Sequence, residues 1–358
     1  MELLSVTMND GVMPRSEIEG KDNSSEDKSN YKVVCKGDMV YNSMRMWQGA
    51  NGVSYYDGIV SPAYTVLMPT EEIDNQYFAA LFKTSNLINE FRKNSQGLTS
   101  DTWNLKYPQI RPIRLYIPSL QEQNKISSFI GTLEERIGKQ RQLVDALKKY
   151  KRGVMQKVFR NMSAFSPSGF ETVRLSDIFK KVYRRNSNGE IKNVITNSAE
   201  HGLIPQRDFF DKDIAVDGNT GNYYVIEYGD FVYNPRKSNT APYGPFNRYE
   251  RQEKGIISPL YTCLVLKADI EPAYLAWYFK SDAWYRYIYD NGSQGVRHDR
   301  VSMTDDLLMG MPVIIPSKDS QIKIAKLLDC LEKRFQVELS QCEYLKTVRE
   351  ALLQQLFI

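Results

Sequence analysis

The sequence predicts an α+β protein in which two mixed α/β domains are each followed by a long helix, and the two helices pair as a coiled coil. Three observations support this. Residues 119–160 carry apolar side chains at alternating steps of three and four, the spacing of a coiled-coil seam. The same seam recurs 198 residues later, in residues 317–358. Matching motifs upstream of both helices indicate that a whole unit, domain plus helix, is duplicated.

The duplication divides the 358 residues into four parts. We predict a first domain over residues 1–118, a first helix over 119–160, a second domain over 161–316 and a second helix over 317–358. In the first domain, short strand-like runs at 31–34, 39–42 and 64–68 are separated by Gly, Asn and Asp turns, and 75–93 has helical apolar spacing.

The first long helix has a clear start. Ser119 stands three residues before Glu122, which is the pattern of a capping box. Gly131, Gly138 and Gly153 each cost about 1 kcal/mol relative to alanine inside a helix. The helix therefore needs a packing partner to be stable.

The predicted partner is the second helix. The apolar seam residues of the first helix are Ile126, Ile130, Leu133, Ile137, Val144, Leu147 and Val154. Those of the second are Ile324, Leu328, Leu331, Phe335, Leu345 and Leu352. Even the polar interruptions coincide at the same offset, because Gln140 matches Glu338 and Lys151 matches Arg349.

The second domain repeats the first with one asymmetry. Residues 201–205 resemble residues 10–14 at an offset of 191, so the first domain has no counterpart of residues 170–191. That stretch contains apolar residues that the first domain would otherwise bury. We expect either that the chain is truncated at its amino end or that another segment or chain fills the gap.

Composition places the chain among ordinary globular proteins, with 42% hydrophobic and 25% charged residues. The sequence has no apolar run long enough to span a bilayer and no basic-then-apolar start, so we expect a cytoplasmic protein. The four cysteines lack C-x-x-C spacing and are expected to be buried free thiols. With two histidines in the chain, no metal site is expected.

The charges of the first helix are asymmetric. Between Ser119 and Arg160 there are ten basic and four acidic residues. This favours a polyanion or an acidic protein surface as neighbour, and a solvated outer helix face is the alternative. The sequence contains no phosphate-binding loop and no dinucleotide motif, so it predicts no active site in this chain.

The loops of both domains are rich in side chains that bind DNA. Arginine pairs bidentately with guanine, asparagine and glutamine pair with adenine, and lysine holds phosphates. The candidates in the first domain are Arg45, Gln48, Asn51, Gln96, Thr99 and Asn104. Those in the second domain are Arg236, Lys237, Asn239, Asn247, Arg248, Gln294, Arg297, His298 and Arg300. For each residue taken alone, an ordinary polar loop is the alternative.

The geometry of the repeat favours DNA binding for the set. About 40 helical residues at about 1.5 Å each make a rod near 60 Å long. If the helices pair antiparallel, a domain sits at each end, and two recognition surfaces lie about one to two DNA turns of about 34 Å apart.

The chain resembles the DNA-specificity subunit of a type I restriction-modification enzyme. The motifs that carry this are P-S-L-x-E-Q-x-K-I at 118–126, K-K-Y-K-R-G-V-M-Q-K-V-F at 148–159, their echoes at 315–324 and 352–357, and the paired G-D-x-V-Y-N and S-P-x-Y motifs. The resemblance implies two target-recognition domains, each reading half of a split DNA sequence, and an antiparallel helix pair that sets their spacing.

The resemblance also implies partners. Two methyltransferase (modification) subunits would dock on the chain, and restriction subunits would join the full complex. S-adenosylmethionine, ATP and Mg²⁺ would belong to those subunits, and this chain would have no catalytic residue. The alternative is a coiled-coil interaction scaffold without DNA specificity, which would show no salt-dependent, sequence-specific DNA binding.

Overall fold

The computed structural model describes residues 1–8, 10–18, 20, 22, 24–100, 103–208, 220–292 and 299–357. The chain separates into two compact units: unit 1 comprises Met1–Val144 and Glu338–Ile358, and unit 2 comprises Asp145–Val337. Each unit therefore joins one globular domain to one part of each long helix. The two units do not coincide with the four consecutive parts predicted from the sequence, because each long helix is divided between both units.

Unit 1 contains two small sheets. Its strands are β1 (Glu2–Thr7), β2 (Gly11–Pro14), β3 (Lys32–Val34), β4 (Met39–Asn42), β5 (Asn51–Val53), β6 (Gly58–Val60) and β7 (Tyr64–Leu67). One sheet has the order β2-β1-β6-β3, with β1 and β6 parallel, and the other is the antiparallel β5-β4-β7. The short helices are η1 (Arg15–Glu17), η2 (Met46–Gln48), α1 (Asn75–Leu81), α2 (Ser85–Asn94) and α3 (Tyr107–Ile110).

Unit 2 repeats this arrangement and adds strands. Its strands are β8 (Phe170–Arg174), β9 (Phe179–Lys181), β10 (Ile195–Ser198), β11 (Gly202–Pro205), β12 (Tyr224–Ile226), β13 (Phe231–Tyr233), β14 (Phe246–Arg248), β15 (Gly255–Ile257), β16 (Thr262–Leu266) and β17 (Pro312–Pro316). The central sheet is β14-β13-β16-β9, beside the pairs β10-β11, β12-β15 and β17-β8. The helices are α5 (Met162–Phe165), α6 (Leu175–Ile178), η3 (Gln206–Asp208), α7 (Pro272–Lys280), α8 (Tyr285–Asn291) and α9 (Asp305–Met309).

The two domains repeat each other down to the register of the central strands. Met39 in β4 lies opposite Leu67 in β7, and Phe231 in β13 lies opposite Leu264 in β16. The predicted α+β class with two mixed domains is confirmed, and the repeated register is the structural counterpart of the repeated motifs.

The G-D-x-V-Y-N motif builds the turn before each central strand. Gly37 and Gly229 have φ angles of 100° and 92°, a left-handed conformation that favours glycine. The following aspartates, Asp38 and Asp230, each accept a hydrogen bond from the backbone N–H three residues earlier, at 2.8 and 2.9 Å. The motif is thus a structural turn in both domains.

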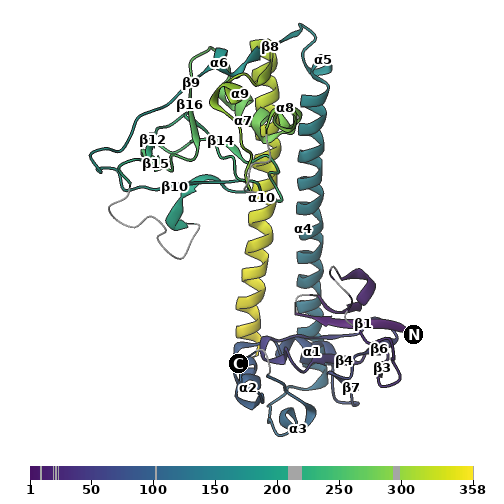
Figure 1. Cartoon of the computed structure of the whole chain (residues 1–358). Helices are drawn as coiled ribbons and strands as arrows, with labels where there is room; N and C mark the ends of the chain where they lie inside the picture. The colour runs from purple at the N-terminus through teal and green to yellow at the C-terminus, as the bar shows by residue number, and fades with distance from the viewer. Residues whose placement is uncertain are drawn as a thin grey trace. The chain divides into compact units, whose positions relative to one another are not determined.

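The long helices α4 (Leu120–Arg160) and α10 (Lys318–Leu356) pack antiparallel, as the resemblance implied (Figure 1). All of the predicted apolar seam residues are buried or half-buried. An aromatic residue within α4, and one directly after α10, each pack on a globular core. Phe159 packs on Tyr274 in unit 2 with ring centroids 5.8 Å apart, and Phe357 packs on Tyr77 in unit 1 at 5.1 Å.

Polar contacts between the helices repeat with the same offset of 198 residues. In unit 1, Glu134 of α4 pairs with Arg349 of α10. In unit 2, Lys151 of α4 pairs with Glu332 of α10, so each ion pair is the sequence equivalent of the other. Gln140 donates to the Glu338 carboxylate at 2.7 Å, and these two residues are themselves equivalent.

We expect the two ion pairs to contribute equally. Their side chains are partly exposed, 21% and 31% for Lys151 and Glu332, so a double-mutant cycle to alanine should give a coupling energy of about 0.5–1.5 kcal/mol for each pair. The measurement is urea unfolding of the single and double variants of Lys151–Glu332 and of Glu134–Arg349. Coupling in one pair alone would contradict the equivalence of the two contacts.

A buried glutamine ties the start of each long helix to a globular domain. Gln123 accepts from the Asp74 N–H and donates to the Pro118 carbonyl, both at 3.0 Å. Gln321, its equivalent, accepts from the Glu271 N–H and donates to the Pro316 carbonyl, both at 2.8 Å. Asp74 and Glu271 are the N-cap residues of α1 and α7, so each glutamine joins two helix starts.

Gln321→Leu is expected to lower the free energy of unfolding of unit 2 by about 2–3 kcal/mol, because it leaves an N–H and a carbonyl without their partner. Urea unfolding followed by tryptophan fluorescence checks this, since Trp277 and Trp284 report on unit 2. Lys323→Ala, an exposed change on the same helix, is the matched control. A loss no larger than that of the control would contradict the structural role of Gln321.

The expectation for the cysteines is half wrong. All four are free thiols, but Cys35 and Cys330 are exposed, and only Cys263 and Cys342 are buried. Cys35 lies at the turn after β3, and Cys330 lies away from the helix seam. Burial raises the pKa of Cys263 to about 12, so this thiol stays protonated. Within the residues described, no helix is both long and apolar enough to cross a membrane.

Candidate nucleic-acid interface

Two predicted DNA-binding loops of the second domain meet in unit 2. The Val301 N–H donates to the Pro235 carbonyl at 2.9 Å, and the Lys237 N–H donates to the Asp299 carbonyl at 2.8 Å. The residues between these contacts, Arg236 and Arg300, form a β-bridge. Segments about 60 residues apart in sequence therefore present one surface.

The Asp299 carboxylate lies between two guanidinium groups on this surface. It is 3.6 Å from Arg236 and 3.8 Å from Arg300. The Arg236 side chain is 67% exposed, and that of Arg300 is 31% exposed. Such an arrangement can hold two guanidinium groups near each other while leaving their outward N–H groups for phosphates or guanine. Arg236 and Lys237 also line a cavity of about 340 Å³ beside β10.

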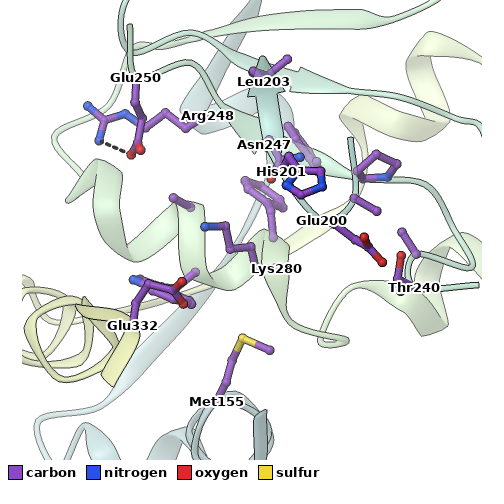
Figure 2. A pocket seen from close by; sticks show the side chains of 18 of the residues that line it. Met155, Glu200, His201, Leu203, Thr240, Asn247, Arg248, Glu250, Lys280 and Glu332 are labelled. Atoms are coloured by element: carbon purple, nitrogen blue, oxygen red, sulfur yellow. Dashed lines mark ion pairs between the residues drawn. The ribbon is translucent and has the colours of Figure 1, made fainter. Parts of the chain in front are cut away.

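A larger cavity of about 1080 Å³ lies in unit 2 between the globular domain and the two long helices. Figure 2 shows Met155 from α4, Glu332 from α10 and Lys280 from α7 around it, together with Glu200 and His201 from the β10–β11 turn. Six basic side chains line it: Lys148, Lys151, Arg152, Arg248, Arg251 and Lys280. The acidic ones are Glu200, Glu250 and Glu332, so the cavity attracts anions.

The acid at the helix side of this cavity remains ionised. Burial alone would raise the pKa of Glu332, but hydrogen bonds from Gln336 and Lys151 outweigh it, and the net pKa is lowered. The ionised Glu332 pairs with Lys151. It therefore does not neutralise Lys148 and Arg152, which are exposed on the same face of α4.

Three predicted DNA-binding residues are engaged within the fold. Asn51 is fully buried in β5, and its amide donates to the Gly49 carbonyl at 3.1 Å. Asn247 in β14 is 7% exposed, and its amide donates to the Asn197 side chain at 2.7 Å. Arg248 lies over the Tyr228 ring with a side chain only 15% exposed. A base could reach the two asparagines only if a strand moved.

The loops of the first domain also converge. Gln96 and Asn104 pair through both backbone hydrogen bonds, at 3.0 and 2.8 Å, and the Leu105 N–H donates to the Ser43 carbonyl at 2.8 Å. The second contact joins this loop to the one that carries Arg45 and Gln48. Arg45, Gln96 and Thr99 are exposed, whereas Gln48 and Asn104 are half-buried.

Sequence reasoning missed an aromatic cluster between these loops. The rings of Trp47 and Trp103 meet edge to face with centroids 5.2 Å apart, and the Arg92 guanidinium lies 5.7 Å from the Trp47 ring. Both tryptophans are half-buried. The sequence feature that could have revealed this cluster is a single tryptophan in each of two polar loops. Such rings can stack on bases or hold the loops together.

Unit 1 has a smaller cavity at the position equivalent to that of unit 2. It has a volume of about 760 Å³ and is lined by Gln48, Lys83, Arg141, Lys346 and Arg349 among others. Burial, reinforced by the nearby Arg349, lowers the pKa of Lys83.

Of the remaining candidates, Asn239 is exposed near Arg236 in the loop after β13. Gln294, Arg297 and His298 lie outside the described residues. Within the described part of the chain, no group of three or more His, Cys, Asp or Glu could hold a metal ion.

Comparison with known proteins identifies a related family. Residues 5–149 match the type I restriction modification DNA specificity domain. Over these residues the chain is similar to the type I restriction-modification specificity family. Specificity subunits of this family are non-catalytic, and the resemblance drawn from the helix motifs is confirmed.

A curated relative supports the same family over part of its length. It is the protein of Methanocaldococcus jannaschii named as the MjaX type I restriction enzyme specificity subunit, 22% identical over 169 residues. The match covers 44% of this chain and 38% of the relative, so it spans less than half of that protein.

Solved structures of the family share the fold of this chain. The HsdS subunit from Thermoanaerobacter tengcongensis is 16% identical with a TM-score of 0.50, covering 97% of this chain and 85% of that one. The S subunit from M. genitalium is 14% identical with a TM-score of 0.55, covering 99% and 94%. A chain from a study of type I R-M complex assembly and conformational transition is 17% identical with a TM-score of 0.58, covering 93% and 84%.

Proposed function

We propose that this chain is the DNA-binding specificity subunit of a type I restriction-modification enzyme and that each globular domain reads one half of a bipartite target. The observation that carries the proposal is the match of residues 5–149 to the DNA specificity domain. The second domain repeats the strand register of the first, which supports a second reading surface. In this proposal the reading domains are residues 1–118 and 161–316, and the helices are 119–160 and 317–358.

The exposed and half-buried loop residues are the proposed contacts to DNA. In the first domain these are Arg45, Gln48, Gln96, Thr99 and Asn104, beside the Trp47–Trp103 pair. In the second they are Arg236, Lys237, Asn239 and Arg300. Asn51 and Asn247 brace strands, and Arg248 is held against Tyr228, so they would act by supporting the loops. Lys148, Arg152 and Lys280 would meet phosphates along the basic cavity of unit 2.

The long helices would set the spacing of the two half-sites and dock two methyltransferase subunits, with restriction subunits in the full cytoplasmic complex. S-adenosylmethionine, ATP and Mg²⁺ would act in those partners. One of the structurally similar chains comes from a study of complex assembly in a type I R-M system, which supports an assembled state for that protein.

Single-molecule mapping of methylated adenines tests the proposal, in DNA from cells that express this chain with its modification subunit. A split motif with two defined halves is the expected result. A single defined half or a palindrome would mean that only the second domain reads DNA. Methylation that does not depend on this chain would favour the scaffold alternative.

A further inference from the structure

The loop that carries Arg236 starts from a buried asparagine. Asn234 directly follows β13 and is 6% exposed. Its side-chain oxygen accepts from the Arg236 N–H at 2.9 Å, and its amide nitrogen donates to the Asn197 carbonyl of β10 at 3.3 Å. The first contact closes a turn through the side chain, which fixes the course of the backbone at Arg236. The second contact ties that turn to a strand of the domain.

Two further buried asparagines extend this contact into a network. The Asn197 amide donates to the Val232 carbonyl of β13 at 2.9 Å. The Asn247 amide of β14 donates to the Asn197 side-chain oxygen at 2.7 Å and to the Ser198 carbonyl at 3.0 Å. Side chains therefore join β10, β13 and β14 beneath the loop. Buried polar networks of this kind rigidify the segments that they connect.

The other end of the loop returns to the same asparagine. Gly244 has a φ angle of 86°, and a Cβ at this position would overlap the Asn234 carbonyl oxygen. Only glycine therefore lets the returning chain pass so close. Between the two ends, the Ser238 N–H donates to the Ala241 carbonyl at 3.0 Å. The loop around Arg236 thus begins and ends against Asn234 and has a fixed course.

The first domain keeps the turn but not the network. Asn42, the equivalent of Asn234, accepts from the Met44 N–H at 3.0 Å. By register, the equivalents of the other two asparagines are Val6 and Gly52, which have no polar side chain. The domain fold therefore forms without the network. Its presence in unit 2 indicates a role that is particular to the second domain.

We propose that Asn234 is a positioning residue for DNA recognition, which acts through Arg236 and is itself held by the asparagine network. This inference rests on the proposed function. The Arg236 side chain is 67% exposed, so its direction depends on the backbone at the turn and on the Asp299 carboxylate 3.6 Å away. A bidentate contact to guanine or phosphate requires a guanidinium group of fixed orientation. The buried Asn234 supplies that orientation without touching DNA.

The test is the methylated motif of cells that express Asn234→Ala with the modification subunit. We expect selectivity at the second half-site to fall about tenfold or more, because a bidentate arginine contact is worth about 1–3 kcal/mol, and the first half-site to stay unchanged. Asn234→Ser is the second variant. Its hydroxyl can still accept from the Arg236 N–H, so it should lose only about threefold.

A double-mutant cycle separates positioning from a general loss of stability. In a chain that already carries Arg236→Ala, adding Asn234→Ala should lower selectivity by no more than about a further twofold, because the two residues act through one contact. Gln321→Leu is the matched control, since Gln321 is buried in unit 2 but bonds to Glu271 and Pro316 instead of this loop. Its methylated motif should equal that of the wild type.

Hydrogen exchange of the chain without DNA measures the turn directly. Asn234→Ala should speed exchange of the Arg236 amide, and Gln321→Leu should not. An unchanged second half-site, equal losses at both half-sites, or additive losses with Arg236→Ala would each overturn the positioning role. A wild-type chain that yields no split motif would overturn the proposed function together with this role. A split motif that both Asn234 variants leave intact would overturn this role alone.

Discussion

Arg236→Ala combined with Arg300→Ala is expected to degrade one half of the methylated DNA motif and leave the other half intact. Both guanidinium groups lie beside Asp299 on the surface where the two loops of the second domain meet. A bidentate arginine contact is worth about 1–3 kcal/mol of discrimination, so losing two should lower selectivity at that half-site by about 100-fold or more. The first domain, with its own loops, should keep its preference.

The measurement is the fraction of methylated adenines at every sequence in cells expressing the variant. Arg45→Ala, in the equivalent loop of the first domain, should relax the other half of the motif. Arg286→Ala is the matched control within the second domain, because Arg286 is 82% exposed on α8 and pairs with Asp290. Equal loss at both half-sites, or an unchanged motif, would contradict the assignment of Arg236 and Arg300.

The long helices and their pairing could be predicted because both signals are periodic. The spacing of Ile130, Ile137 and Val144 requires an apolar partner, and the offset of 198 identifies one. The same offset could have revealed Gln123 and Gln321, since both stand at the same place relative to a proline-serine pair. Their role was invisible because a hydrogen bond from a backbone N–H about 50 residues away in the chain leaves no trace in local sequence.

The DNA-binding candidates were harder to predict because composition does not give the direction of a side chain. Asn51 and Asn247 stand in polar, glycine-containing stretches like their neighbours, yet both fall in short strands whose side chains are buried. The contact between Trp47 and Trp103 could not be predicted, because these rings come together only when the loops around Ser43 and Leu105 join. Which loops meet is a property of the folded domain.

Lys148→Ala combined with Arg152→Ala is expected to weaken binding to all DNA sequences alike. These exposed cations line the 1080 Å³ cavity of unit 2, and neither is the basic partner of Glu332. A lost phosphate contact lowers the slope of log K against log salt by about 0.9, so two should reduce it by about 2 and lower affinity about 10- to 100-fold at physiological salt. Titrations with target and non-target duplexes across a salt series measure both quantities.

The equivalent positions in unit 1 supply the control. Lys346 matches Lys148, but Glu350 matches Arg152, so the unit 1 cavity is less basic at this point. Lys346→Ala should therefore lower the slope of log K against log salt by no more than about 0.9, the value for one phosphate contact. If the double variant keeps its salt slope and instead loses its methyltransferase subunits, the basic helix face meets an acidic protein surface, and DNA must be held by the loops alone.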